Sequence, residues 1–282
     1  MNNLTALPLT AANAQLRWQP APLIKLSMAW HITGIAALIA WPAWWPWILA
    51  ALAGNQLALF AASMWPRSRL LGANMVRLPA TAAARAEVCL TFDDGPDPQV
   101  TPRVLDLLDR HGAKASFFCI GEKAAAYPEM VREIARRGHS VENHTQRHPY
   151  AFAFYGLAGL RREIAAAQTV IAGITGRAPR FFRAPAGFRS PLLDPVLAGC
   201  GMLYVSWTRR GYDSVRRDPA PVLRRLARGL AAGDVLVLHD GARARTAAGE
   251  PVVLAVLPAL LARMAECGLK SVSLPAACGE AA

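Results

Sequence analysis

The chain has 282 residues, enough for one large α/β domain and an accessory segment, and its 54% hydrophobic content excludes a mainly disordered protein. Lys and Arg number 31 against 19 Asp and Glu, a formal net charge of +12. The arginines crowd at 209–228, which fits an anionic partner, such as a phosphate group or lipid surface, or only a solvated helix face. No recognition motif accompanies the charge, so nucleic acid is not expected as a partner. The five widely spaced cysteines indicate reduced core residues.

The N-terminal part of the chain predicts a membrane segment. From Leu26 to Pro66 there is no Asp, Glu, Lys or Arg, and the stretch holds six of the eight tryptophans. It is too long, and begins too late, for a secretory signal. Its length accommodates two short spans, roughly 26–41 and 47–64, separated by a Trp- and Pro-rich turn that suits a membrane interface.

The charges around this segment predict its orientation. Arg17 and Lys25 precede it, four arginines at 67–85 follow it, and the turn carries none. The positive-inside rule then places both ends in the cytoplasm, so we expect a cytoplasmic segment 1–25, an inner-membrane segment 26–66 and a soluble domain facing the cytoplasm. Asn55 and Gln56 interrupt the second span, and one tilted helix or a half-inserted pair would look similar.

After a linker at 67–86, stretches typical of strands and helices alternate, which predicts an α/β fold with a parallel sheet or barrel. The expected strands are 87–92, 115–119, 139–142, 180–182, 201–207, 235–238 and 269–273. The expected helices are 101–110, 122–137, 157–174, 191–199, 218–231 and 251–266.

Polar residues follow several of these strands. Asp93 and Asp94 end the first, His144 and His148 follow the third, Arg183 follows the fourth, and His239 with Asp240 ends the sixth. Because active sites of β/α barrels form at the carboxyl ends of the strands, we expect these side chains to converge. Taken alone, Asp93 and Asp94 would equally fit an ordinary Asp-Gly turn with solvated carboxylates.

His144 and His148 are four residues apart, which on a helical turn would place both imidazoles on one face. With Asp94 they form the two-His, one-carboxylate set of a catalytic zinc site that keeps an open position. Asp93 would then serve as a base, His239 could protonate a leaving amine, and Arg183 could hold Asp93 ionised. Backbone N–H groups at 184–187 offer donors to an oxyanion. We interpret His111 and His139, at helix–strand junctions, as structural.

The chain resembles the polysaccharide deacetylase family, carbohydrate esterase family 4, with its NodB homology domain. The likeness rests on Thr-Phe-Asp-Asp-Gly-Pro at 91–96, His-Thr-x-x-His at 144–148, Arg-x-Pro at 183–185 and Leu-x-Leu-His at 236–239. It implies a distorted seven-stranded barrel at 87–275, followed by a tail at 276–282, that removes acetyl groups from sugars. It also implies a metal held by Asp94, His144 and His148, with Asp93 as base, His239 as acid and Arg183 orienting Asp93.

Two departures from the family pattern stand out. Ala186 occupies a position that is usually aromatic, which thins the wall of the substrate groove. Arg210 stands three residues after Trp207, where members often have an Asp that tunes the acid histidine, and whether Asp213 replaces that Asp stays open. Both changes argue against a long chitin-like chain, whereas an arginine at the groove suits a phosphorylated or lipid-linked sugar.

We therefore expect a membrane-anchored, metal-dependent deacetylase of an amino sugar, carrying acetyl or formyl, on a lipid carrier or nascent glycan. One alternative is a deacetylase of cell-wall or exported polysaccharide, and another is a non-catalytic glycan-binding or scaffold member. The expected cofactor is a divalent metal ion, Zn²⁺ first, although ligand type alone does not choose the metal. The expected partners are the amino-sugar glycan or glycolipid and the membrane.

Overall fold

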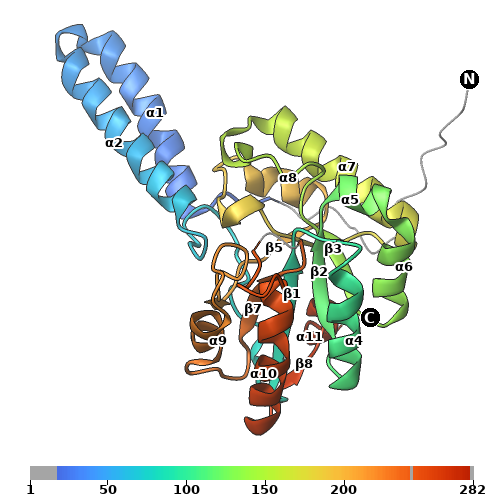
Figure 1. Ribbon diagram of the computed structural model, residues 1–282. Coiled ribbons are helices and arrows are strands. Elements are labelled where there is room, and N and C mark those ends of the chain that lie inside the picture. Colours follow the sequence, from blue (N-terminus) through green and yellow to red (C-terminus); the bar gives the residue numbers. More distant parts are fainter. Residues whose placement is uncertain (1–17, 242–243, 280–282) are drawn as a thin grey trace, which may run out of the picture.

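The computed structural model describes residues 18–241 and 244–279. Most of the predicted N-terminal segment, including Arg17, and the last three residues of the predicted tail therefore lie outside the described residues. The rest consists of a helical hairpin and a barrel-like α/β domain (Figure 1).

The domain is built around a parallel sheet that carries the helices on its outside (Figure 1). Its strands lie in the order β5-β4-β3-β2-β1-β7-β6, and β8 pairs with β1. The strands are β1 (Glu87–Asp93), β2 (Ala115–Cys119), β3 (Ser140–Asn143), β4 (Phe181–Phe182), β5 (Leu203–Tyr204), β6 (Arg209–Arg210), β7 (Val235–His239) and β8 (Lys270–Ser271). The predicted α/β class with a distorted parallel barrel is confirmed.

One predicted strand, 201–207, is too long, because the structure has β5 only at Leu203–Tyr204, and β6 at Arg209–Arg210, which the sequence does not predict, follows on the other edge of the sheet. The N–H of Val205 bonds to Phe182 on one edge, at 2.9 Å, and the N–H of Thr208 bonds to Val235 beside the other, also at 2.9 Å. The four residues 205–208 thus join edge strands β5 and β6 directly, which requires the sheet to curl until its edges nearly meet.

The expected helices are present, and one of them is broken. Pro128 divides the predicted helix 122–137 into α5 and α6, because a proline disfavours helical backbone at the residue before it. Tyr127 accordingly lies at φ −128° and ψ 58°. The helices of the domain are α3 (Ala80–Ala84), α4 (Thr101–Arg110), α5 (Gly121–Ala126), α6 (Pro128–Arg136), η3 (Phe152–Phe154), α7 (Leu157–Thr175), η4 (Pro185–Gly187), α8 (Leu193–Gly199), α9 (Pro219–Ala227), α10 (Val252–Glu266) and α11 (Leu274–Ala277).

The interior of the domain is apolar, as the strand composition predicts. Phe92 and Phe117 stack between β1 and β2 with their ring centroids 5.0 Å apart, and both are fully buried. Cys89 and Cys119 are buried in these same strands, as expected, whereas Cys267 is exposed.

The hairpin projects from the domain as two antiparallel helices, α1 (Pro22–Ala40) and α2 (Trp45–Met64), joined by η2 (Pro42–Trp44) (Figure 1). At 1.5 Å per residue each helix is about 30 Å long, the thickness of a bilayer core. Both helices are long and apolar enough to cross a membrane. Most of their surface is exposed, unlike that of a soluble core helix.

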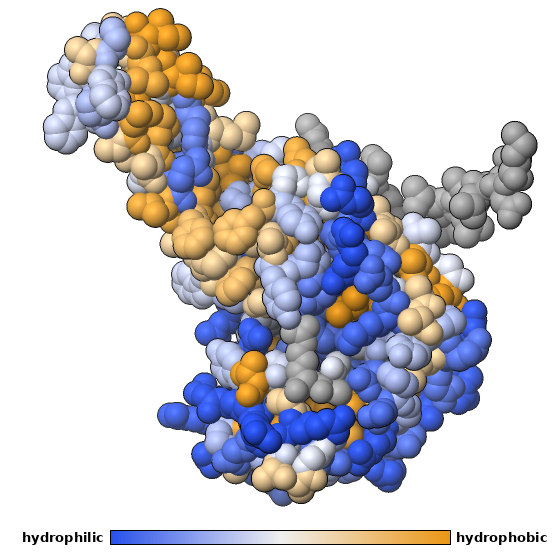
Figure 2. Space-filling view, turned by 45° about the horizontal axis from the view of Figure 1, so that its top comes forward, coloured by the Kyte–Doolittle hydropathy of each residue, from blue (hydrophilic) through white to orange (hydrophobic). Residues whose placement is uncertain are grey.

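Polar side chains join the two helices near the middle of the hairpin. Asn55 donates to the Ser27 hydroxyl at 2.8 Å. The Nδ1–H of His31 donates to the Ser27 carbonyl at 2.7 Å, which leaves His31 Nε2 to accept from Gln56 at 2.9 Å. Figure 2 shows a hydrophilic strip along the hairpin beside its hydrophobic surface. The residues that interrupt the apolar run therefore bond to each other.

The end of the hairpin that adjoins the domain packs against it. The N–H of Arg189 bonds to the Ser63 carbonyl at 3.1 Å, and Phe60 stacks with Phe154 at a centroid distance of 6.5 Å. These contacts fix the end of α2 beside the loop that follows β4.

Candidate active site

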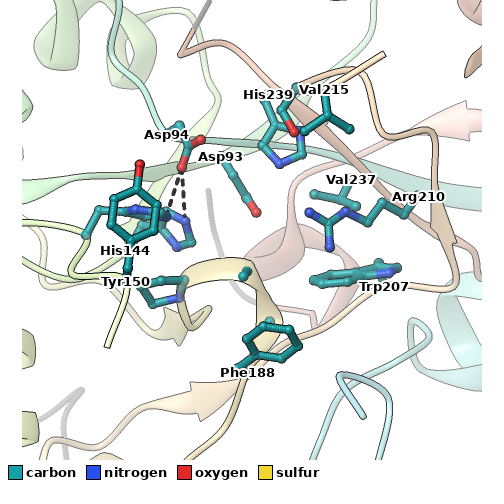
Figure 3. A pocket seen from close by; sticks show the side chains of 15 residues that line it. Asp93, Asp94, His144, Tyr150, Phe188, Trp207, Arg210, Val215, Val237 and His239 are labelled. Carbon is teal, nitrogen blue, oxygen red and sulfur yellow. Dashed lines mark ion pairs between the residues drawn. The ribbon is translucent and has the colours of Figure 1, made fainter. Parts of the chain in front are cut away.

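The site is centred on the two carboxylates at the end of β1. Consecutive residues of a strand point to opposite faces, yet Asp93 and Asp94 both line one pocket. Asp94 lies at φ 71°, a left-handed conformation that turns the chain directly after the strand. The turn therefore brings both carboxylates into the same space (Figure 3).

Arg183 fixes the Asp93 carboxylate. Its guanidinium lies 2.6 Å from Asp93 Oδ1 and also donates to the Thr91 hydroxyl at 2.8 Å and to the Ser206 carbonyl at 3.0 Å. The Arg183 side chain is fully buried and stacks on Phe118 at 4.1 Å. Because its donors are committed in this way, the arginine holds Asp93 in one orientation.

Asp94, His144 and His148 form a cluster suited to a metal ion. Each offers one ligand atom, and these atoms lie within 4.8 Å of one another. Asp94 Oδ1 is 3.4 Å from His144 Nε2 and 3.2 Å from His148 Nε2. The structure thus brings together the three ligands that the sequence predicts.

The loop that carries the two histidines is not helical, so the predicted helical turn is wrong. Thr145 and His148 both have positive φ, at 68° and 54°. Asn143 Oδ1 accepts from the Thr145 N–H at 2.9 Å, and the Thr145 hydroxyl accepts from the His148 N–H at 3.0 Å. Side chains acting on the backbone, and not helical periodicity, bring the imidazoles together.

Neighbouring groups set the protonation of His144 and Asp94 in a way that favours binding of a cation. His144 Nδ1 lies 2.8 Å from the Arg183 carbonyl, which can only accept, so Nδ1 carries the proton and Nε2 presents its lone pair to the cluster. Burial alone would raise the pKa of Asp94, but a hydrogen bond from His144 in its doubly protonated form and the charges of the nearby histidines lower it below its usual range, whereas a neutral His144 offers Nε2 as a ligand atom instead. Asp94 is thus ionised, and the donor set fits a divalent metal.

His239, at the end of β7, lies in the pocket beside Asp93 of the neighbouring strand β1. Its Nδ1 is 2.9 Å from Asp213 Oδ1, and its backbone N–H donates to Asp213 Oδ2 at 2.7 Å. Burial disfavours the imidazolium, yet the Asp213 carboxylate outweighs burial and raises the pKa of His239. Asp213 therefore makes the contact that the sequence left open.

The loop after β4 presents backbone to the pocket. The N–H groups of Gly187 and Phe188 bond within the turn, at 2.9 Å to Ala184 and 3.1 Å to Pro185. Ala186 lines the pocket at φ 55°, and its N–H makes no hydrogen bond within the described part of the chain. Of the donors expected at 184–187, Ala186 is therefore the one available on the pocket wall.

Aromatic residues that the family pattern does not identify line the remaining wall. Tyr150 and Phe188 face the pocket together with Trp207 and Arg210 (Figure 3). Phe188, two residues after Ala186, supplies an aromatic ring to the wall that the sequence predicted to be thinned. Periodicity does not identify Tyr150, because it lies in an irregular loop.

Asp240 does not join the site, although the sequence placed it among the converging residues. Its side chain turns away from the pocket lining and accepts from the Thr101 hydroxyl at 2.6 Å. Burial raises the pKa of Asp240 to about 7. Asp240 packs beneath the β1 loop instead, where its oxygens occupy the space beside Gly95.

Comparisons with known proteins agree with this geometry. A family model described as polysaccharide deacetylase matches residues 81–205. A chitooligosaccharide deacetylase of Azorhizobium caulinodans is 35% identical over an alignment of 192 positions, and the match covers 64% of this chain and 90% of that protein. A peptidoglycan-N-acetylglucosamine deacetylase of Bacillus cereus is 44% identical over 103 residues, 36% of this chain and only 37% of that protein.

Comparison of the fold with solved structures indicates the same class of protein, a deacetylase. A crystal structure of a peptidoglycan N-acetylglucosamine deacetylase matches with a TM-score of 0.65 and 28% identity, covering 72% of this chain and 91% of that one. Fold and site together define a hydrolase that acts on N-acetyl amide bonds. The chain belongs to the polysaccharide deacetylase family, carbohydrate esterase family 4.

Proposed function

We propose that the protein is a membrane-anchored, divalent-metal-dependent deacetylase that removes the N-acyl group, acetyl or formyl, of an amino sugar. The observation that carries the proposal is one pocket that joins the Asp94, His144 and His148 cluster to an arginine-held Asp93 and an Asp-paired His239. These are the parts that metal-dependent amide hydrolysis uses: a metal site, a base and an acid.

Asp94, His144 and His148 would hold the metal, with Zn²⁺ as the expected ion. When bound, the metal supplies Lewis-acid polarisation of the acyl oxygen and a lowered pKa of water.

The chain's own residues perform the proton transfers in the proposed mechanism. Asp93, oriented by Arg183, takes the proton of the attacking water. The backbone N–H of Ala186 donates to the oxygen that becomes negative at the acyl carbon. His239 gives its proton to the amine as the carbon–nitrogen bond breaks, and Asp213 stabilises the charged imidazole before that step.

The named relatives support an amino sugar as substrate, since they are deacetylases of chitooligosaccharide and of peptidoglycan N-acetylglucosamine. For this chain we propose N-acylated amino sugars carried on a lipid or in a nascent glycan. The support is the attachment of α2 beside the loop at 185–189, which keeps the pocket close to the membrane that the hairpin would cross. The charge distribution around the hairpin favours a site that faces the cytoplasm, at the inner membrane.

The experiment that tests this function measures acetate released from N-acetylated chitooligosaccharides by the purified full-length protein. We expect release by the zinc-loaded protein, loss after chelation and recovery on adding Zn²⁺ back. Asp94→Ala protein should not recover, because it lacks the carboxylate ligand. Release that survives complete removal of metal would contradict the proposal, and zinc binding without hydrolysis of any acylated amino sugar would favour a glycan-binding or scaffold role.

A further inference from the structure

We propose that Arg210 binds a phosphate group attached to the acylated sugar, so that the pocket selects glycosyl phosphates over neutral glycosides. The inference rests on the proposed function for the identity of the sugar. It concerns the part of the pocket that lies beside His239, away from the metal cluster (Figure 3).

The position of Arg210 follows from the sheet. Arg210 lies on β6 in register with Val237 of β7, and both line the pocket. Val237 and His239 are two residues apart on β7 and therefore point to the same face. A group held by Arg210 would lie next to the sugar whose amine His239 protonates.

The guanidinium of Arg210 is held in place but lacks an anionic partner. It stacks on Trp207 and on Tyr212, at 5.0 Å from each ring centroid. Its Nε is buried without a hydrogen-bond partner, and among the described residues no carboxylate pairs with it. An ordered arginine with unused donors is suited to a planar, bidentate contact with phosphate.

The other charges of the pocket are balanced within the protein. Arg183 pairs with Asp93, and Asp213 pairs with His239. Asp94 faces the two histidines that would share its metal. Arg210 therefore adds a positive charge that the described pocket residues do not neutralise, and an anionic substrate group would do so.

The test compares two probes, N-acetylglucosamine 1-phosphate and methyl N-acetylglucosaminide. Binding is measured by calorimetry on zinc-loaded, full-length protein carrying Asp93→Asn to prevent turnover. A charge-assisted contact predicts a dissociation constant at least about tenfold lower for the phosphate. In the same Asp93→Asn protein, the additional substitution Arg210→Gln should abolish most of the difference between the two dissociation constants. Arg210→Lys should retain part of it. Arg216→Gln, which removes an exposed arginine outside the pocket lining, should preserve it.

Equal dissociation constants for the two probes, or a preference that persists in Arg210→Gln, would overturn the inference. Acetate release from neutral chitooligosaccharide is measured in parallel, so that loss of the phosphate preference is distinguished from absence of deacetylase activity. A further arm presents the same sugar on a polyprenyl phosphate in vesicles. Tighter binding of the vesicle substrate than of the soluble phosphate would identify a lipid as the source of the phosphate, and the reverse would identify a soluble sugar phosphate.

Discussion

Asp213 sets the protonation of His239, because its carboxylate raises the pKa of the imidazole against the effect of burial. We predict that Asp213→Asn moves the alkaline limb of the pH–rate profile to lower pH, since the proton that the leaving amine needs is lost earlier. At pH 8 we expect activity to fall by about tenfold or more. Asp106→Asn, an exposed acid far from the pocket, should leave the profile unchanged, and an unshifted profile in Asp213→Asn would contradict the role.

His139 makes the stability of the fold depend on pH. Its Nδ1 accepts from the Ala115 N–H at 3.1 Å, and burial, followed by nearby Lys114, lowers its pKa to about 4. The unfolded chain binds this proton near pH 6.5, so the stabilisation is complete above that pH and is lost as the pH falls toward 4. The loss amounts to about 3 kcal/mol.

The measurement is urea unfolding of the full chain at pH 7.5 and pH 4.5. His139→Asn keeps an acceptor but does not titrate, so its free energy of unfolding should fall less between the two pH values than that of the wild type. The same fall in both proteins would contradict the assignment. The sequence interpretation of His139 as structural stays a prediction that this experiment checks.

At the scale of elements, the conformation of the loop at 144–148 depends on a residue outside the loop. Glu163, on α7, is buried. Its carboxylate accepts hydrogen bonds from the backbone N–H of Arg147, at 3.0 Å, and from the guanidinium of Arg147, at 2.6 Å. We predict that Glu163→Ala weakens zinc binding by about tenfold, because the loop that holds His148 loses its anchor. A zinc titration against a chelating dye measures this. Glu129→Ala, an exposed acid in a surface ion pair, serves as the matched control, and equal affinities in both variants would reject the anchoring role.

The same loop shows where sequence reasoning succeeds and where it stops. The convergence of Asp94, His144 and His148 follows from their positions after strands, because parallel strands bring their carboxyl ends to one edge. The conformation of the loop does not follow, because it depends on Asn143, Thr145 and the distant Glu163. Spacing alone suggested a helical turn that the positive φ values of Thr145 and His148 exclude.

The edges of the sheet are a second example of structure that local sequence does not predict. The pattern at 201–207 indicates one strand, and the separate strands β5 and β6 arise only from hydrogen bonds to β4 and β7, which lie far away in the sequence. For the same reason the pairing of Asp213 with His239 was left open. Local pattern predicts which residues favour strands, whereas tertiary contacts decide which strand each one joins.

At the scale of the whole molecule, the hairpin and the domain make a prediction about topology. If both helices span the inner membrane and the positively charged flanks stay inside, the domain lies in the cytoplasm. A C-terminal reporter that is active only outside the cytoplasm should then be silent. Cys267 is exposed on the domain, so a membrane-impermeant maleimide should label it only after lysis, with Cys267→Ser as the control. An active reporter with labelling in intact cells would mean a single span and a wall or exported polysaccharide as substrate.

The central claim is that the pocket hydrolyses an amide with Asp93 as base beside a bound metal. The most direct test measures metal content and acetate release on the same preparations of wild-type and Asp93→Asn protein. We predict equal zinc content in both and a loss of activity of at least about 100-fold in Asp93→Asn, because the metal ligands are intact while the base is absent. Full activity in Asp93→Asn would contradict the assignment of the base, and zinc-loaded wild type without activity would contradict the enzyme.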